Sequence, residues 1–333
     1  MKLVISGYGA NPANTIALYS FKDSNLEMQW QTSVENPSYL CEEDGYLFTV
    51  TEAQNYACVY LFQRTTSGYQ LLDQKTIEGG DLCHITYSKK NKALFGACYG
   101  TGTLFSIRVE EGGFGDVLFH EVQVSEKLTK TPVSLTRAHC VLLNKEESML
   151  LVINIELDRI YFYEIQEGFL KLVRTLDTPS GTGPRHAIYS ADERFIYIIT
   201  EYSNEIFIYG NNSTMDMLQR VSTLSPNYTG ISKCSTLCFS KEGTFLYAAN
   251  RGADTIAVFT VKKDGTLELI QQYDCEGKHP RHMIISQDGR YLIICNQFSD
   301  NIIVFELDEV TGGLINKVTS LDFSSPSGIV QVK

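Results

Sequence analysis

The chain has 333 residues, of which 43% are hydrophobic and 20% charged, a composition typical of a globular protein with ample material for a core. Its 28 Lys and Arg against 39 Asp and Glu give a formal net charge of −11, without a basic stripe, which disfavours nucleic-acid and anionic-membrane partners. No segment is apolar for long enough to span a bilayer, and MKLVISGYGANPAN at the start is unlike a signal peptide.

The nine cysteines occur singly in strand-like runs or loops, and no CxxC pair is present. This pattern favours reduced, mostly buried thiols in a cytoplasmic protein and disfavours a zinc site. Val, Ile, Tyr and Phe recur in short alternating runs, whereas helical periodicity is scarce, so the sequence predicts an all-β fold.

In chain order, residues 1–21 predict two strands separated by a loop, and a repeating unit follows. Each copy has a loop, a strand, a polar corner and a second strand; the starts lie near Pro37, His84, His139, His186, Thr236 and His282. The steps, about 47–55 residues, suit a four-stranded propeller blade. Residues 324–332 resemble the opening strand of a further blade, which residues 1–21 would complete.

These units predict one domain over residues 1–333: a seven-bladed β-propeller of four-stranded antiparallel blades, with a closing blade shared by the N- and C-termini. Such closure removes a free sheet edge. In a propeller the first strand of each blade lines a central channel, so residues near its start and at the corner after the second strand are expected at one channel mouth.

Four histidines, His84, His139, His186 and His282, begin apolar stretches that end some 14–15 residues later, at Cys98, Asn154, Thr200 and Asn296. We interpret them as one repeated position. They are candidates for substrate binding, and they equally suit structural hydrogen bonds between blades.

Three segments carry a resemblance to a known family: GPRHAIYSADERFIYIITE, LYAANRGADTIAVF and PRHMIISQDGRYLIICNQFSDNIIVFELDEVTGGL. They resemble the repeat signature of the seven-bladed lactonases, which include propeller-type 6-phosphogluconolactonases and, as relatives, carboxymuconate-lactonising enzymes. The similarity covers essentially the whole chain and is strongest from 180 to 315.

The resemblance implies hydrolysis of 6-phospho-D-glucono-1,5-lactone, in the oxidative pentose phosphate pathway. Its lactonising relatives place a histidine, two arginines and a glutamate at the channel mouth, which by motif correspond to His139, Arg185, Arg251 and Glu201. These four are the predicted catalytic residues.

The chemistry of these side chains fits that role. Guanidinium groups offer two parallel donors to a phosphate, a carboxylate or a developing oxyanion, so Arg185 and Arg251 are the expected anion-binding pair, with Arg281 as a third candidate. His139 and Glu201 are the expected acid–base pair. The alternative is that the arginines pair with acidic loops and the histidine is structural.

Asn250, Asn296 and Glu52 complete the predicted substrate-binding set with His84, His186, Arg281 and His282. The asparagines equally suit turns that bond their own backbone. We expect no cofactor; a calcium ion held by Glu201 and the asparagines is the alternative. The expected partner is a small anionic sugar lactone, and the expected state a monomer or weak homodimer. A lactonising isomerase and a non-catalytic binding propeller remain competing functions.

Overall fold

A computed structural model describes residues 1–9, 15–124 and 136–332. The chain divides into two compact units, one made of Met1–Gln31 with Arg185–Lys333 and the other of Thr32–Pro184. Each unit is described by itself. The predicted loop between the first two strands includes residues 10–14, which lie outside the described residues, and the single-domain organisation stays a prediction.

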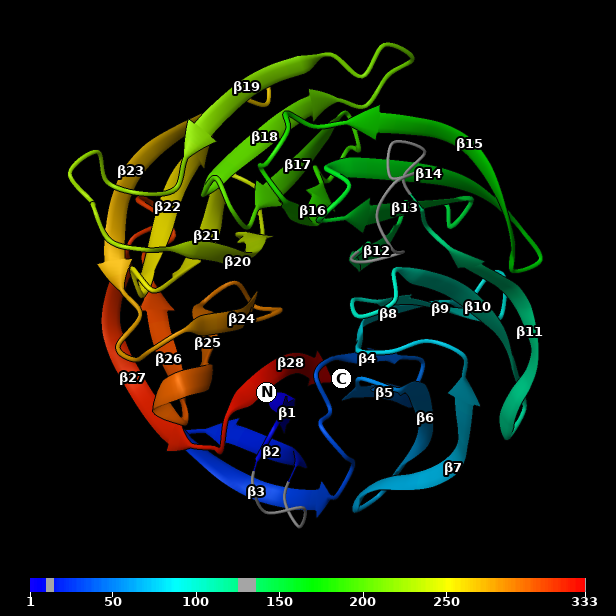
Figure 1. Ribbon diagram of the computed structural model, residues 1–333. Coiled ribbons are helices and arrows are strands. Elements are labelled where there is room, and N and C mark those ends of the chain that lie inside the picture. The colour runs from blue at the N-terminus through cyan, green and yellow to red at the C-terminus, as the bar shows by residue number, and fades with distance from the viewer. Residues whose placement is uncertain (10–14, 125–135, 333) are drawn as a thin grey trace. The chain divides into compact units, whose positions relative to one another are not determined.

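The second unit contains three four-stranded antiparallel sheets, each in sequence order from its first strand to its fourth (Figure 1). The first comprises β4 (Leu40–Glu43), β5 (Tyr46–Ala53), β6 (Tyr56–Thr65) and β7 (Gly68–Ile77). The next comprises β8 (Leu82–Ser88), β9 (Ala93–Cys98), β10 (Thr103–Glu110) and β11 (Gly113–Val122). The third comprises β12 (Ala138–Leu143), β13 (Met149–Asn154), β14 (Arg159–Gln166) and β15 (Phe169–Asp177).

The first unit contains four more sheets of the same kind. Three are consecutive in the chain: β16 (Pro184–Tyr189), β17 (Phe195–Thr200), β18 (Glu205–Gly210), β19 (Met217–Ser222); β20 (Lys233–Phe239), β21 (Phe245–Arg251), β22 (Thr255–Val261), β23 (Leu267–Asp274); and β24 (Pro280–Ile285), β25 (Tyr291–Asn296), β26 (Asn301–Leu307), β27 (Leu314–Asp322). A short 3-10 helix, η2 (Gln297–Ser299), follows β25.

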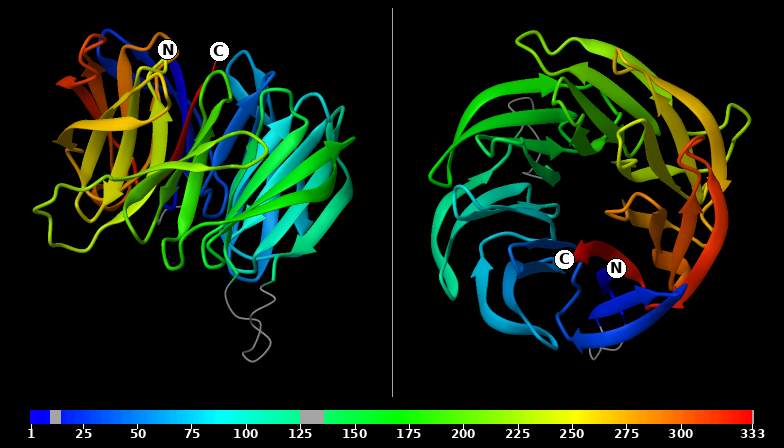
Figure 2. Two further views of the ribbon diagram at one scale, coloured as in Figure 1. Left: turned by 90° about the horizontal axis from the view of Figure 1, so that it is seen from above. Right: turned by 180° about the vertical axis from the view of Figure 1, so that it is seen from behind.

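The fourth sheet of this unit joins the two chain ends. β28 (Pro326–Val332) pairs antiparallel with β1 (Lys2–Gly7), which continues to β2 (Ile16–Lys22) and β3 (Asn25–Thr32). Figure 2 shows red β28 beside dark-blue β1 from behind. The predictions of an all-β fold, of seven four-stranded blades and of a closing blade shared by both termini are confirmed. Within the described residues, no helix reaches the length and apolarity that a membrane crossing requires.

The burial of each strand explains its sequence pattern, which differs between the second and the fourth strand of a blade. The second strand of each blade is packed on both faces, so β17 reads as a continuous apolar run, FIYIIT, with five of its six residues buried. The fourth strand has a solvent face, so β19, MLQRVS, contains no buried residue. Consecutive blades pack face to face: Tyr197 and Ile208 of one lie in a core cluster with Leu246 and Phe259 of the next.

The first strand of a blade carries a β-bulge near its start, at the same register in several copies. Leu82 pairs with Cys98, and the next pair is His84 with Ala97, which leaves Cys83 as the extra residue. The extra residues at the same position in β12, β24 and β28 are His139, Arg281 and Ser327. Bulges re-aim side chains and are common beside active sites.

This register corrects one prediction. His139 is the second residue of β12, whereas His84, His186 and His282 are each the third residue of their strands. His139 therefore shares its position with Arg185 and Arg281, and Cys140 occupies the histidine position of its blade. A bulge residue and its successor point in different directions, so the four histidines are not one repeated position.

The asparagines at the ends of the second strands tie each blade to the linker before it. The amide of Asn250 donates to the Thr223 carbonyl (3.0 Å) and its oxygen accepts from the Thr223 hydroxyl (2.6 Å). Asn296 donates to the Cys275 carbonyl (3.0 Å). Both asparagines are fully buried. Structural contacts thus engage both amide nitrogens, and the substrate-binding role of the two asparagines stays a prediction.

Replacing Asn250 with alanine is expected to lower the free energy of unfolding by about 1–3 kcal/mol, because the Thr223 carbonyl and hydroxyl would each lose one buried hydrogen bond. Urea denaturation measures this change. Asn25→Ala is the control: Asn25 is exposed, its amide donates to the Asp23 carbonyl at 3.3 Å, and its replacement should leave the midpoint unchanged. Equal midpoints for the two variants would contradict a stabilising role for the Asn250 contacts.

Candidate anion-binding active site

The first unit brings three of the four predicted catalytic residues into one ion cluster. Glu201 follows β17; its Oε2 contacts Arg185 Nε at 3.0 Å and Arg251 Nη2 at 3.0 Å, and its Oε1 contacts Lys233 Nζ at 3.3 Å. Glu201, Arg185 and Arg251 are all less than 9% exposed. One buried carboxylate thus faces three cations, so the cluster retains an excess of two positive charges.

The charges around Glu201 determine its protonation. Burial by itself would raise the pKa of this carboxyl, but the nearby charges of Arg251, Arg185 and Lys233 outweigh burial and lower it to about 2. Glu201 is therefore ionised at neutral pH and is a very weak base. This environment suits a counter-ion that orients two arginines better than the proton acceptor that the sequence analysis expected.

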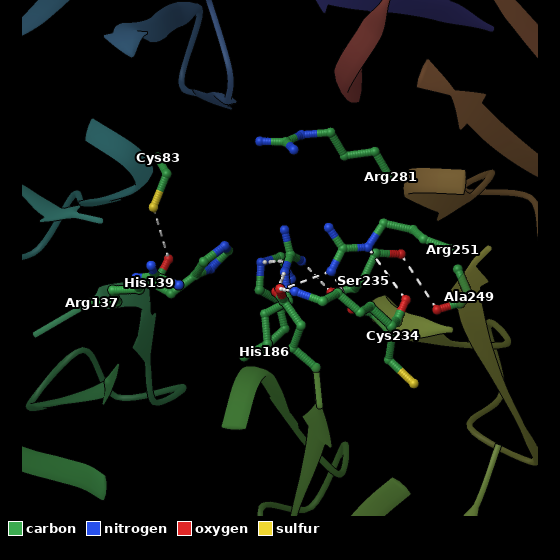
Figure 3. Close-up of polar contacts among 12 residues, drawn as sticks. Cys83, Arg137, His139, His186, Cys234, Ser235, Ala249, Arg251 and Arg281 are labelled. Atoms are coloured by element: carbon green, nitrogen blue, oxygen red, sulfur yellow. Dashed lines mark hydrogen bonds and ion pairs between the residues drawn. The ribbon is translucent and has the colours of Figure 1, made fainter. Parts of the chain in front are cut away.

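Backbone carbonyls of β20 fix both guanidinium groups. Arg251 Nη2 donates to the Cys234 carbonyl at 2.7 Å and its Nε to the Lys233 carbonyl at 3.3 Å, as Figure 3 shows in part. Arg185 Nη1 donates to the Ser235 carbonyl and lies 3.3 Å from His186 Nε2. Arg251 Nη1 makes no hydrogen bond to the residues that the structure describes. The arginines are pre-positioned, and Arg251 retains a donor for a ligand.

Arg281 adds a third guanidinium to the same unit. It occupies the bulge of β24, donates from Nη2 to the Tyr8 hydroxyl at 2.6 Å, and lies over the Tyr8 ring at 5.1 Å from its centroid. Figure 3 shows Arg281 and Arg251 extending in the same direction from β24 and β21. Tyr8 was not predicted as a site residue. It follows β1 as Glu201 follows β17, and Arg251 ends β21 at the corresponding corner.

His282 has a structural contact within this unit. Its Nδ1 accepts a hydrogen bond from the Ile329 backbone N–H at 3.2 Å, so that nitrogen carries no proton. Burial, Arg185 and Arg281 lower the pKa of His282 to about 4, in agreement with a neutral ring. This blade-to-blade bond is the structural alternative weighed for the repeated histidines, and the substrate-binding role of His282 stays a prediction.

The second unit contains the remaining predicted residues. His139 is 6% exposed, and its ring meets the Tyr99 ring edge-on at 6.0 Å. Its carbonyl accepts from Cys83 Sγ at 3.6 Å, a contact drawn in Figure 3. The Arg137 guanidinium lies over the Tyr99 ring, 4.7 Å from its centroid, and its Nη1 forms an ion pair with Glu156 Oε1 at 2.9 Å. The catalytic role of His139 stays a prediction.

His84 and Glu52 also lie in the second unit. His84 Nδ1 accepts from the Val141 backbone N–H at 3.4 Å, the same blade-to-blade bond as that of His282, and its ring is 4.1 Å from that of Tyr39. Glu52 is half-buried in β5. Burial of Asp81 raises the pKa of the Asp81 carboxyl, and the nearby negative charge of Glu52 raises it further.

Two residues of the first unit were missed by the sequence analysis. Lys233 begins β20, lies opposite Arg251 in the strand pairing and contacts Glu201. His279 immediately precedes β24, and burial followed by the charges of Arg251 and Arg281 lowers its pKa to about 4. It occupies the position held by Asp81, Gly183 and Ser325 in other blades, and because none of these is a histidine, the repeat gave no reason to select it.

The ion cluster predicts a stability change in acid. The folded-state pKa of Glu201, about 2, lies below its ordinary value of 4.5, so its ion pairs stabilise the fold fully above pH 4.5 and are lost as pH falls towards 2. We expect the free energy of unfolding to fall by a few kcal/mol across that window. Urea denaturation at successive pH values measures it, and Glu201→Gln should flatten the profile; an identical profile in the variant would contradict this origin.

The blades and the terminal blade built from both chain ends define an all-β propeller protein. Its first unit carries a buried arginine–glutamate cluster. Residues 2–331 match the family described as "Lactonase, 7-bladed beta-propeller", and the chain belongs to this family. It is, as a member, a lactone hydrolase.

Named relatives agree with this class. The chain is 26% identical over 310 residues to a 6-phosphogluconolactonase of Bacillus subtilis, covering 89% of each sequence. It is 28% identical over 239 residues to a 6-phosphogluconolactonase of Photorhabdus laumondii, covering 71% of this chain and 70% of the relative. A periplasmic gluconolactonase of Pseudomonas aeruginosa has the same fold, with a TM-score of 0.89, 24% identity and coverage of 99% of this chain and 98% of that one.

Proposed function

We propose that the lactone is 6-phospho-D-glucono-1,5-lactone and that the protein hydrolyses it in the cytoplasm, in the pentose phosphate pathway. The observation that carries this proposal is the surplus of positive charge around Glu201 in a protein whose net charge is −11. Buried arginines with a spare donor suit an anionic substrate. The names of the relatives in B. subtilis and P. laumondii support this substrate. The nine free cysteine thiols support a reducing compartment, as the cytoplasm is.

Lactone hydrolysis requires water to attack the carbonyl carbon while negative charge develops on the carbonyl oxygen. Arg251, held by Glu201 and by two β20 carbonyls, would donate to that oxyanion or to the phosphate. Donors fixed in advance stabilise developing charge without reorganisation. Arg185 and Arg281 would provide the remaining cationic contacts, and Glu201 would keep the guanidinium groups in place.

We further propose that the reaction needs no metal. Glu201 is surrounded by three cations, and Asn250 Oδ1 already accepts a hydrogen bond from the Thr223 hydroxyl, so these two residues are poor calcium ligands. Activity should therefore survive treatment with EDTA. Loss of activity that added calcium restores would overturn this part of the proposal.

The substrate assignment is tested with lactone made in situ from glucose 6-phosphate by its dehydrogenase. Hydrolysis is followed by the release of acid, beside a blank for spontaneous hydrolysis and a parallel assay with unphosphorylated glucono-1,5-lactone. We expect a much higher kcat/KM for the phosphorylated lactone. A rate no higher than the blank, or a preference for the neutral lactone, would overturn the assignment.

A further inference from the structure

His279 is held in an unusual backbone conformation beside the arginine cluster. Its φ is +61°, in the left-handed region that residues other than glycine seldom adopt. Two hydrogen bonds keep it there: its N–H donates to Asp254 Oδ1 at 2.8 Å, and its carbonyl accepts from the Gln297 N–H at 3.0 Å. Asp254 Oδ1 also accepts from the Gly252 N–H at 3.1 Å, next to Arg251. Asp81, Gly183 and Ser325, which directly precede β8, β16 and β28, also have positive φ, so this conformation belongs to the entry of a blade. At this entry, only the blade of β24 has a histidine among these four, and the conformation places it beside the arginine cluster.

The imidazole of His279 is oriented by stacking and is available for chemistry. Its ring lies parallel to that of Phe298 in η2, with 3.9 Å between centroids and 22° between planes. Neither ring nitrogen makes a hydrogen bond to a residue that the structure describes, and the side chain is half-buried. His279 thus differs from His282 and His84, each of which has a ring nitrogen bonded to the backbone of a neighbouring blade.

The charged groups that act on His279 come from several elements. Arg251 at the end of β21, Arg281 in β24 and Arg185 in β16 lower its pKa after burial, and Asp254 in the turn before β22 opposes them. Asp254 is itself paired with Lys278 at 3.1 Å. With its pKa at about 4, His279 is neutral throughout the physiological range, which is the state that a base requires.

We propose that His279 is the general base that activates the attacking water in lactone hydrolysis, an inference that rests on the proposed function. A neutral ring nitrogen accepts a proton from water as the water oxygen bonds to the lactone carbonyl carbon. The resulting tetrahedral oxyanion is stabilised by the neighbouring guanidinium groups. Collapse of this intermediate breaks the bond between that carbon and the ring oxygen, and the imidazolium returns the proton to the departing oxygen. The product is the open-chain acid, which ionises in water.

An anionic substrate would strengthen this base. The arginine charges hold the pKa of His279 low, so an anion bound among them partly cancels their effect and raises the pKa towards its ordinary value of 6.5. A stronger base accepts the proton from water more readily. The phosphate of the substrate would therefore contribute to the rate as well as to binding, although it takes no part in bond breaking.

The first test compares His279→Gln with His120→Gln, which alters an exposed histidine of the second unit that contacts the Glu78 carbonyl. We expect kcat of His279→Gln to fall about 100-fold with KM changed less than about threefold, and the His120 variant to match the wild type. His279→Gly accommodates the positive φ and leaves space for a small molecule. Added imidazole should restore part of its rate, which a structural role for the side chain would not predict.

The second test follows the His279 imidazole by NMR through a pH titration, with inorganic phosphate as the probe and His279→Gln to assign the signal. We expect phosphate to raise its pKa by about 0.5–1 unit and to leave that of His120 unchanged. An active wild type with His279→Gln kinetics within threefold of it would overturn the inference and leave the lactonase proposal intact. A wild type that does not hydrolyse the phosphorylated lactone would overturn both, and a phosphate-independent pKa would overturn the substrate effect.

Discussion

Replacing Arg251 with methionine is expected to lower kcat/KM for 6-phosphogluconolactone by about 100- to 1000-fold, the range found when a fixed donor to a developing oxyanion is removed. Methionine has a similar length but no charge and no donor. The β20 carbonyls of Lys233 and Cys234 therefore lose a hydrogen bond, while the space of the Arg251 side chain remains filled. Glu201 keeps Arg185 and Lys233 as partners. Steady-state kinetics with the phosphorylated lactone measure the loss.

Arg220→Met is the matched control for this prediction. Arg220 pairs with Glu205 at 2.7 Å and lies over the Phe207 ring, but its side chain is 44% exposed and it does not contact the ion cluster. Its kcat/KM should equal that of the wild type. If Arg251→Met stayed within threefold of Arg220→Met, Arg251 would have no part in binding the reacting group.

The number and build of the blades could be predicted from the sequence because each blade repeats one burial pattern. Inner strands packed on both faces need unbroken apolar runs such as FIYIIT, and the tight turns need residues that accept positive φ, as at Asp44, Glu193 and Gly243. The terminal blade could be predicted for the same reason: PSGIVQV has the burial pattern of an opening strand although it lies at the other end of the chain from β1.

The site was only partly predictable, and one-residue register explains why. The stretch that begins at His139 ends 15 residues later, whereas those that begin at His84, His186 and His282 end 14 residues later, and this extra residue was the sign of a different position. A bulge determines which of two consecutive side chains is re-aimed, and bulges have no strong sequence signature. The alignment by histidine therefore concealed that His139 corresponds to Arg185 and Arg281.

The role of Glu201 was also beyond sequence reasoning. A carboxylate near a histidine suggests proton transfer, but its function depends on the charges within a few ångströms. Lys233 and the two arginines come from three different strands, and only their convergence lowers the pKa of Glu201 to about 2. His279 could not be selected from the sequence for the same reason, because the arginines that act on it are distant from it in the chain.

Replacing Glu201 with alanine is expected to reduce the free energy of unfolding by about 3–5 kcal/mol, because it leaves Arg185 and Arg251 buried without their counter-ion. The control is Glu205→Ala. Glu205 also pairs with an arginine, but this pair lies at the surface, with the Arg220 side chain 44% exposed, and surface pairs contribute about 0–1 kcal/mol. Urea denaturation at pH 7 compares the two variants, and a loss below 1 kcal/mol for Glu201→Ala would contradict a stabilising role for the cluster.

Glu201→Ala also tests whether the three cations around Glu201 form an anion-binding site. Without Glu201, three cations face a space that an anion of the solution can occupy, so phosphate should bind the folded variant more tightly than the folded wild type. Binding to the folded state alone raises stability in proportion to the logarithm of ligand concentration. The Tm of Glu201→Ala should therefore rise more steeply with phosphate than that of the wild type or of Glu205→Ala. Parallel slopes would mean that the three cations do not form an anion site, and the substrate anchor would then have to be sought elsewhere in the protein.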